Sequence, residues 1–241
     1  MKHVRFSLGE HDREGTLAGD VVMTSGGSYP LSSVRLLAPC RPTKIVCVGR
    51  NYAAHVKEMG SDLPARPLIF FKPPSAVIDP LAEIVYPPQS ARVDFEGELA
   101  VVIGRRCRNV SRADAFSVIR GYTALNDVTA RDLQKTDGQW ARAKGFDTFA
   151  PIGPCIVDDL DPSALRLRTL LNGQVRQDAR TASMIFDVPA LVEYISAAFT
   201  LEAGDVIATG TPDGVGPMQP GDEVRVEIEG IGALVNRVVR G

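Results

Sequence analysis

Cysteine is scarce in this sequence, and its few residues are scattered. The four cysteines lie at least seven positions apart and form no CxxC pair: Cys40, Cys47, Cys107 and Cys155. This spacing excludes the common zinc and dithiol motifs, and it gives no disulfide framework. We therefore expect buried thiols in a protein of the reducing cytoplasm.

An excess of positive charge is also missing. The chain has 27 Lys and Arg against 29 Asp and Glu, which gives a formal net charge of −2. Nucleic acids and anionic membranes bind basic patches, so this balance predicts neither partner. No apolar run approaches the roughly 18 residues of a membrane span. The first residues, Met1–Ser7, also lack the apolar core of a signal peptide.

The 241 residues suffice for one large domain with a small appendage. Residues 1–42 contain short apolar runs separated by turn formers, which predicts a small β-meander. Residues 43–241 read as further short strands with a few short helices, a mixed, β-rich pattern. Within them, Ser111 caps a predicted helix at about 112–119, Asn172-Gly173 turns a hairpin, and Asp187 caps a helix beginning near Pro189.

An acidic stretch, Val93–Gly104, is the first candidate site. If it forms one strand, Asp94, Glu96 and Glu98 share a face, with about 6.5–7 Å between successive members. The opposite, apolar face comprises Val93, Phe95, Leu99, Val101 and Ile103. Neighbouring carboxylates repel one another unless a cation lies among them. The stretch therefore predicts either a solvated edge face or a divalent-metal site with oxygen ligands.

Histidine is rare, with three residues in the chain, and His55 is the one outside the N-terminal segment. His55 and Glu58 lie three residues apart in a short predicted helix that glycines flank, so they share one helix face. A carboxylate beside an imidazole raises its basicity, as a general base requires. The pair is either an ordinary surface contact or a base on a mobile lid.

Two further residues allow two interpretations each. Asp127 follows an apolar strand and either caps the next helix or supplies a third metal ligand. Lys144 lies between small and aromatic residues and is either a surface cation or a substrate-facing one.

A glycine-rich loop begins at Gly210-Thr211, where backbone amides and a hydroxyl can hold an oxyanion.

Taken together, these segments resemble the fumarylacetoacetate hydrolase family, and within it bacterial members of the 2-hydroxyhepta-2,4-diene-1,7-dioate isomerase type. The resemblance covers roughly residues 43–240 and rests on these blocks: Val48–Tyr52 with His55 and Glu58, Phe71-Lys72-Pro73, Glu96-Gly97-Glu98, Asp127–Gln134, Lys144-Gly145-Phe146, Ser183–Phe186 and Gly210-Thr211-Pro212. It implies a β-sandwich or β-roll catalytic domain with a few short helices, a homodimer, and a bound Mg²⁺ or Mn²⁺, with Ca²⁺ in some members.

The resemblance also implies roles for individual residues. Glu96, Glu98 and Asp127 would bind the metal, and Asp94 would lie behind them or face solvent. His55 with Glu58 would activate water, and Lys144 would contact the reacting carbonyl. Thr148 would support the water ligands of the metal. The residues implied to bind the substrate are Arg50, Tyr52, Lys72, Gln134, Gly210 and Thr211.

The implied substrates are small 2-oxo, β-diketo or dicarboxylic acids, because adjacent carboxylate and keto oxygens chelate a hard cation that stabilises an enolate. Hydrolysis of a C–C bond, as in acylpyruvates, and decarboxylation of an oxaloacetate-like acid are the first hypotheses. An isomerase or decarboxylase of homoprotocatechuate-type aromatic catabolism is the alternative. From another class, the chain could be a non-catalytic, metal-dependent protein that binds small acids.

Overall fold

Short β-branched runs closed by glycine, proline or charged residues form most of the strands. The computed structural model describes residues 1–241, and its largest sheet has twelve strands. In spatial order they are β4 (Gly27–Pro30), β3 (Val21–Thr24), β2 (His11–Ala18), β1 (Lys2–Leu8), β14 (Ala150–Val157), β12 (Ile119–Asn126), β11 (Gly97–Ile103), β17 (Val206–Ala208), β6 (Ile45–Gly49) and β7 (Leu68–Lys72), with β5 (Arg35–Leu37) beside β1 and β8 (Val77–Ile78) beside β14.

Two smaller sheets complete the β structure. The five-stranded sheet has the order β16 (Gln174–Arg180), β15 (Arg166–Leu171), β19 (Glu223–Ile228), β20 (Gly232–Arg240) and β9 (Glu83–Tyr86). The three-stranded sheet has the order β13 (Thr129–Ala130), β10 (Val93–Phe95) and β18 (Gly216–Met218). Strand pairs are antiparallel except β17 with β6, β14 with β8, and β20 with β9.

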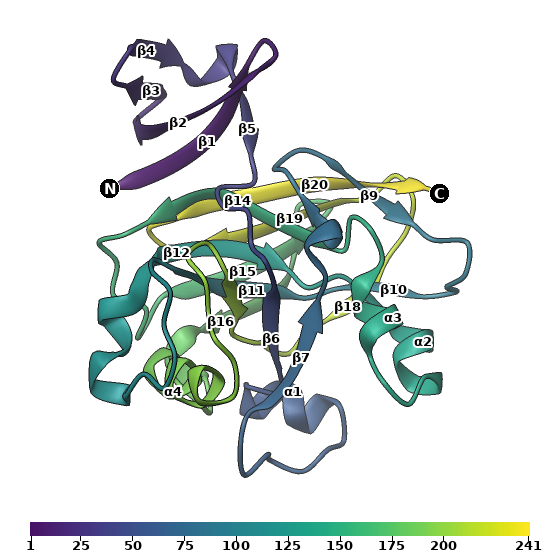
Figure 1. Cartoon of the computed structure of the whole chain (residues 1–241). Helices are drawn as coiled ribbons and strands as arrows, with labels where there is room; N and C mark the ends of the chain where they lie inside the picture. The colour runs from purple at the N-terminus through teal and green to yellow at the C-terminus, as the bar shows by residue number, and fades with distance from the viewer.

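The helices are few and short, as the sequence predicts. They are α1 (Ala53–Glu58), α2 (Arg131–Thr136), α3 (Ala141–Gly145) and α4 (Val188–Ala198), with 3₁₀ turns at η1 (Leu31–Ser33), η2 (Pro74–Ala76), η3 (Arg112–Val118) and η4 (Thr181–Ser183). The longest, α4, has 11 residues, and none has the length and apolarity needed to cross a membrane. Figure 1 shows α2 and α3 together on one side of the strands and α4 on the other.

The core explains why β11 is an unbroken apolar run. Leu99 and Val101 point into the largest hydrophobic cluster, where side chains of β15, β19, β20 and α4 also pack. Ala100 and Val102 point to the opposite face, into a second cluster with β6 and β14. A strand buried on both faces carries apolar residues at consecutive positions rather than in alternation. The fold is therefore the β-rich, sandwich-like arrangement expected.

Several local predictions are confirmed, with one change of helix type. Asn172 and Gly173 turn the β15–β16 hairpin with positive φ angles of 52° and 76°. Asp187 caps α4 by accepting a hydrogen bond from Ala190 N. Ser111 caps its segment as predicted, but η3 is a 3₁₀ helix rather than an α-helix.

The N-terminal strands β1–β4 form the expected meander, which projects from the rest of the chain in Figure 1. They are joined to the large sheet, because Lys2 pairs with Val157 and His3 with Ile156. The ammonium group of Met1 and the ring of His3 also bind the Asp158 carboxylate. A domain boundary at residue 42 stays a prediction.

The prediction of one strand over Val93–Gly104 is wrong. The segment is two strands, β10 and β11, that belong to different sheets and are separated at Glu96. The physical reason lies at Gly97, where an added Cβ would stand 2.0 Å from Thr169 Oγ1. Close packing against β15 therefore fixes the position at which the chain passes from one sheet to the other.

Candidate active site

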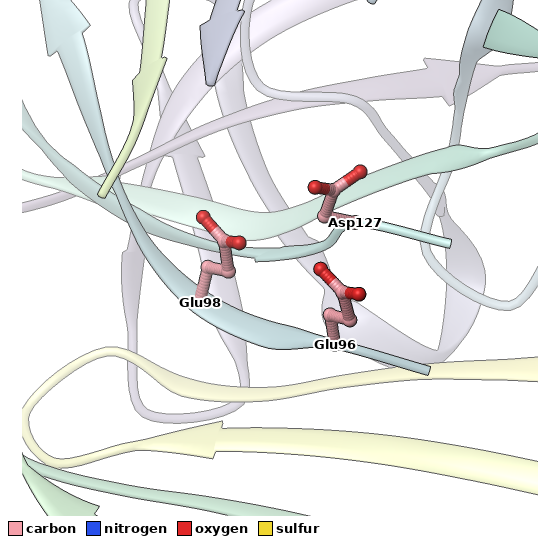
Figure 2. A group of neighbouring side chains, drawn as sticks. All are labelled: Glu96, Glu98 and Asp127. Carbon is pink, nitrogen blue, oxygen red and sulfur yellow. The ribbon is translucent and has the colours of Figure 1, made fainter. Parts of the chain in front are cut away.

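Three carboxylates meet where this strand break faces the end of β12. Glu96 lies between β10 and β11, Glu98 is on β11, and Asp127 directly follows β12. Antiparallel pairing of β11 with β12 aligns the segments, and Asp127 N donates to Glu96 O over 2.8 Å. One oxygen from each carboxylate lies within 4.8 Å of the others (Figure 2). We call Glu96, Glu98 and Asp127 the carboxylate cluster.

The carboxylate cluster is buried, so the solvated edge face proposed for this stretch is wrong. The three residues are 5%, 1% and 1% exposed, respectively. Asp127 caps no helix either, since α2 begins at Arg131. Burying three adjacent carboxylates costs free energy unless cations or hydrogen-bond donors compensate their charge.

Two lysines supply part of that compensation. Lys144 of α3 donates to Glu96 Oε2 over 2.8 Å and to Asp127 Oδ2 over 2.6 Å. Lys72 of β7 donates to Asp127 Oδ1 over 2.6 Å and to Val128 O. Although burial opposes a charged amine, the adjacent Asp127 and Glu96 raise the pKa of Lys144 above its ordinary value. Lys144 is therefore held as a cation between Glu96 and Asp127, and the Lys72 amine contacts Asp127 from the other side.

Arg131 joins Asp94 to the carboxylate cluster. Its guanidinium donates to Asp94 Oδ2 over 2.9 Å and also binds Glu96. Asp94 is fully buried and binds Arg92 as well, so the alternative that Asp94 faces solvent is wrong. Burial acts to raise the pKa of Glu96, but Lys144 and Arg131 outweigh it and hold that pKa well below its usual range.

Glu98 is the one carboxylate of the cluster that no cation contacts. Its hydrogen bond comes from the backbone amide of Gly210, over 2.7 Å. Burial, followed by the charges of Asp127 and Glu96, raises the pKa of Glu98 well above its ordinary value. A buried carboxylate without a counter-ion, aimed at two others, is the donor set that a hard divalent cation requires. These residues therefore fit a Mg²⁺ or Mn²⁺ ion.

The second pair of groups stands on α1. His55 Nδ1 lies 3.1 Å from Glu58 Oε2; His55 is 6% exposed and lines a cavity, whereas Glu58 is exposed at the surface. Glu58 also accepts from Gly214 N, with N···O distances of 3.1 and 3.3 Å. A carboxylate that accepts from Nδ1 leaves Nε2 of the neutral imidazole free to take a proton. The geometry is that of an oriented base.

A cavity of about 190 Å³ joins the two groups. Among the predicted site residues, its walls include Arg50, His55, Glu96, Glu98, Asp127, Gln134, Lys144 and Thr211. Drug-sized ligands occupy pockets of roughly 300–1,000 Å³, so this cavity suits a smaller molecule. Trp140 and Phe70 supply an apolar wall, and the Phe70 ring lies 4.9 Å from the Lys144 ammonium.

Other predicted residues lie around the cavity rather than in its wall. Lys72 is turned to Asp127, and the Gly210 amide to Glu98. Tyr52 is buried with no partner for its hydroxyl, and burial, with a contribution from Glu98, raises its pKa. The Thr148 hydroxyl accepts from Val85 N over 2.9 Å, and its role toward the water ligands of a metal stays a prediction.

Three residues at the site received no role from the sequence. Arg131 lies four residues after Asp127 in one of the blocks that carry the family resemblance, so an arginine close to a carboxylate was an available signal. Lys135, in the cavity wall, and Gln177, which contacts the 210–214 segment, had none. The partners of Gln177 lie far away in sequence, and only the folded chain brings them together.

The family can now be stated. The family profile described as "Fumarylacetoacetate (FAA) hydrolase C-terminal" matches residues 44–239. The chain belongs to the fumarylacetoacetate hydrolase family. The matched residues include every site residue described above, while β1–β5 precede them.

Solved structures and curated relatives agree with this assignment. A structure described as 5-carboxymethyl-2-hydroxymuconate delta-isomerase from Mycobacterium smegmatis is 50% identical, with a TM-score of 0.94 over 100% of this chain and 99% of that one. Maleylpyruvate hydrolase from Sphingobium sp. SYK-6, solved with manganese(II) and pyruvate, is 32% identical, with a TM-score of 0.85 over the whole of both chains. The mitochondrial oxaloacetate tautomerase FAHD2A of Bos taurus is 44% identical over 87% of this chain and 71% of its own.

Proposed function

We propose that this protein is a divalent-metal-dependent enzyme that shifts a proton next to the oxo group of small 2-oxo diacids. The product would be a keto–enol tautomer or a shifted double bond. The observation that carries the proposal is the buried His55 ring, which lines the same small cavity as the carboxylate cluster and is paired with Glu58 behind it. Relatives named for an isomerase and a tautomerase catalyse such proton shifts, which supports this choice.

In this proposal, one group of residues binds the metal and another transfers the proton. Glu96, Glu98 and Asp127 would hold Mg²⁺ or Mn²⁺, which supplies Lewis-acid charge to the substrate's oxo oxygen when bound. His55 would remove the proton from the neighbouring carbon, and Glu58 would stabilise the imidazolium that results. Such a base contributes typically 10²–10⁴-fold to the rate.

The cations of the cavity support a substrate with two carboxylates. Arg131 and Lys144 are neutralised by carboxylates of the protein. Arg50 and Lys135 are exposed residues of the same wall, and neither forms a salt bridge in the structure. A carboxylate of the substrate would supply their missing partner. Gln134 and Thr211 add hydrogen-bonding groups to this wall.

Hydrolysis of a C–C bond is the second candidate, because an oriented imidazole can remove a proton from water as well as from carbon. The maleylpyruvate hydrolase relative supports it. Decarboxylation of an oxaloacetate-like acid would use the same cavity without the base. The three reactions differ in their products, so one assay separates them.

The purified protein is tested with Mg²⁺ or Mn²⁺ on oxaloacetate, acetylpyruvate, maleylpyruvate and a 2-hydroxymuconate-type diacid. Absorbance of the enol follows tautomerisation, and coupled lactate dehydrogenase detects any pyruvate that cleavage or decarboxylation releases. We expect enol turnover that EDTA abolishes and that His55→Asn lowers at least 100-fold, with no change in His11→Asn, a control on the exposed strand β2. Turnover that survives EDTA would refute the metal requirement, and pyruvate release as the main product would favour cleavage or decarboxylation.

The homodimer stays a prediction. One feature in its favour is β7, the edge strand of the large sheet, on which Leu68 and Phe71 are exposed. An apolar, unpaired edge is a common site of association. Light scattering after size exclusion measures the molar mass directly, and a monomer at micromolar concentration would contradict the prediction.

A further inference from the structure

One buried side-chain amide in the β15–β16 hairpin makes no hydrogen bond to the hairpin itself. β16 is exposed at most positions, yet Gln177 on this strand is 1% exposed. Its Oε1 accepts from Gly97 N over 3.0 Å, and its Nε2 donates to Thr211 Oγ1 and Pro212 O, both over 2.8 Å. Burial of a side-chain amide is unfavourable unless its groups are paired, and the partners of Gln177 all belong to other segments.

The first partner of Gln177 is Gly97, which lies between two residues of the carboxylate cluster. Gly97 stands between Glu96 and Glu98, and its N–H group is taken by Gln177 while its C=O group accepts from Thr211 Oγ1 over 2.9 Å. Gly97, Gln177 and Thr211 thus form a closed ring of hydrogen bonds. This ring fixes the backbone from which Glu96 and Glu98 both project.

The second set of partners lies in residues 210–214, which we call the 210–214 loop. At one end, Gly210 N donates to Glu98 Oε2 over 2.7 Å. At the other end, Gly214 N donates to Glu58 Oε1 over 3.1 Å. The same five residues therefore contact the carboxylate cluster and the carboxylate that orients His55.

β16 supports this loop at two adjacent positions. Gln177 holds Thr211 and Pro212, and Arg176 O lies 2.1 Å from the place that a Cβ on Gly214 would occupy. Gly214 also has a φ of +90°, a conformation that other residues adopt rarely. The loop is thus pressed against β16 where its amide faces Glu58.

Helix α1 has one polar side-chain contact with a distant part of the chain, beside the burial of His55 and Val56. Among residues 53–60, the side-chain hydrogen bond to a distant part of the chain is the one between Glu58 and Gly214. The backbone hydrogen bonds of these residues stay within the helix and its ends. A six-residue helix is marginal without tertiary contacts, so loss of the Glu58 contact would free its C-terminal end.

We propose that Gln177 is a positioning residue that couples the carboxylate cluster to the His55–Glu58 pair through the 210–214 loop. The proposal rests on the proposed function, because it assigns Gln177 to the orientation of that base. When a cation fixes Glu98, the Gly210 amide is fixed with it, and Gln177 keeps the rest of the loop in the register that presents Gly214 N to Glu58. A bound cation would thus hold the loop, and with it Glu58 and His55, in the orientation that the structure shows.

Hydrogen exchange of α1, followed by mass spectrometry with and without Mn²⁺, tests the coupling without any substrate. In the wild-type protein we expect saturating Mn²⁺ to slow exchange of the α1 amides about tenfold or more. In Gln177→Leu we expect Mn²⁺ still to bind, with an affinity lower by about 10–100-fold, but to leave α1 exchange unchanged. Gln174→Leu, the same substitution at an exposed position of β16, should behave as wild type.

Activity gives a second measurement. We expect Gln177→Leu to lower kcat by about 10–100-fold at saturating Mn²⁺ while KM changes less than threefold, since the residue does not line the cavity. If Gln177→Leu fails to fold, Gln177→Glu keeps the acceptor for Gly97 N and removes both donors to the loop. That variant should likewise bind Mn²⁺ without protecting α1.

The outcomes separate the two proposals. Equal protection of α1 by Mn²⁺ in the wild type and the Gln177 variants would overturn the coupling, as would a wild-type α1 that does not respond to Mn²⁺. A wild-type protein that shows the coupling but turns over none of the four acids would overturn the proposed function and leave the coupling supported.

Discussion

Replacement of Glu98 by glutamine should make the metal-free protein more stable. The three carboxylates of the cluster have oxygens within 4.8 Å of one another. At an effective dielectric of about 20, two charges at that separation repel by about 3–4 kcal/mol. Lys144 and Lys72 offset part of this repulsion for Glu96 and Asp127, but no cation contacts Glu98. We therefore expect Glu98→Gln to gain about 1–3 kcal/mol, while its Oε1 still accepts from the Gly210 amide.

The gain should depend on pH with a definite sign. The pKa of Glu98 is raised in the folded protein, chiefly by burial, so the folded state holds this proton more tightly than the unfolded state. Protonated Glu98 therefore stabilises the wild-type protein at pH values below its pKa in the unfolded chain. This stabilisation is lost as the pH rises through the pKa of Glu98 in the folded protein. The advantage of Glu98→Gln over wild type should be smallest near pH 4.5 and should grow toward neutral and alkaline pH.

Thermal unfolding in EDTA and in Mn²⁺ measures this effect. For a chain of this size, 1–3 kcal/mol corresponds to a Tm increase of about 2–12 °C in EDTA. At 1,000 times its Kd, Mn²⁺ should add about 4.1 kcal/mol to the wild type and little to the variant, so the order of stability reverses. Glu14→Gln, at an exposed position without a side-chain hydrogen bond, is the control. A Glu98→Gln protein that is less stable than wild type in EDTA would refute the reasoning.

Three other substitutions have defined outcomes. Lys144→Met should destabilise the metal-free protein by about 3–5 kcal/mol in urea, because it leaves Glu96 and Asp127 buried without their shared cation; an unchanged midpoint would contradict this. Gly97→Ala should cost about 3 kcal/mol or more, since its Cβ would lie 2.0 Å from Thr169 Oγ1, and circular dichroism would detect retained folding as the opposing result. Asp205→Ala should cost about 3–4 kcal/mol, because this buried carboxylate accepts from backbone and side-chain donors near residues 43 and 202; a loss under 1 kcal/mol would show that water replaces them.

The sequence was sufficient to indicate which residues gather at the site. The local pattern placed Asp94, Glu96 and Glu98 together, and the family resemblance singled out Glu96 and Glu98 with Asp127. The i,i+3 spacing of His55 and Glu58 is the spacing the folded helix uses. The choice between a solvated face and a buried site could not be made from the strand alone. It depends on the lysines of β7 and α3, which reach the cluster from distant parts of the chain.

What the sequence could not supply is the set of long-range polar contacts. The strand break at Glu96 is due to the close packing of Gly97 against Thr169. Because Thr169 lies on another sheet, no local sequence pattern could predict this contact. Gln177 sits in a polar hairpin and looks like any surface glutamine until the fold buries it against Gly97.

The most direct test of the account is solvent proton exchange at the carbon next to the oxo group of oxaloacetate, followed by NMR in D₂O. After subtraction of the rate without enzyme, the account predicts deuterium incorporation that requires Mg²⁺ or Mn²⁺ and is lost in both Asp127→Asn and His55→Asn. These variants remove one member from each of the two groups that the cavity joins. Incorporation at the wild-type rate in EDTA, or in His55→Asn, would contradict the claim that the carboxylate cluster and the His55–Glu58 pair act together on one substrate.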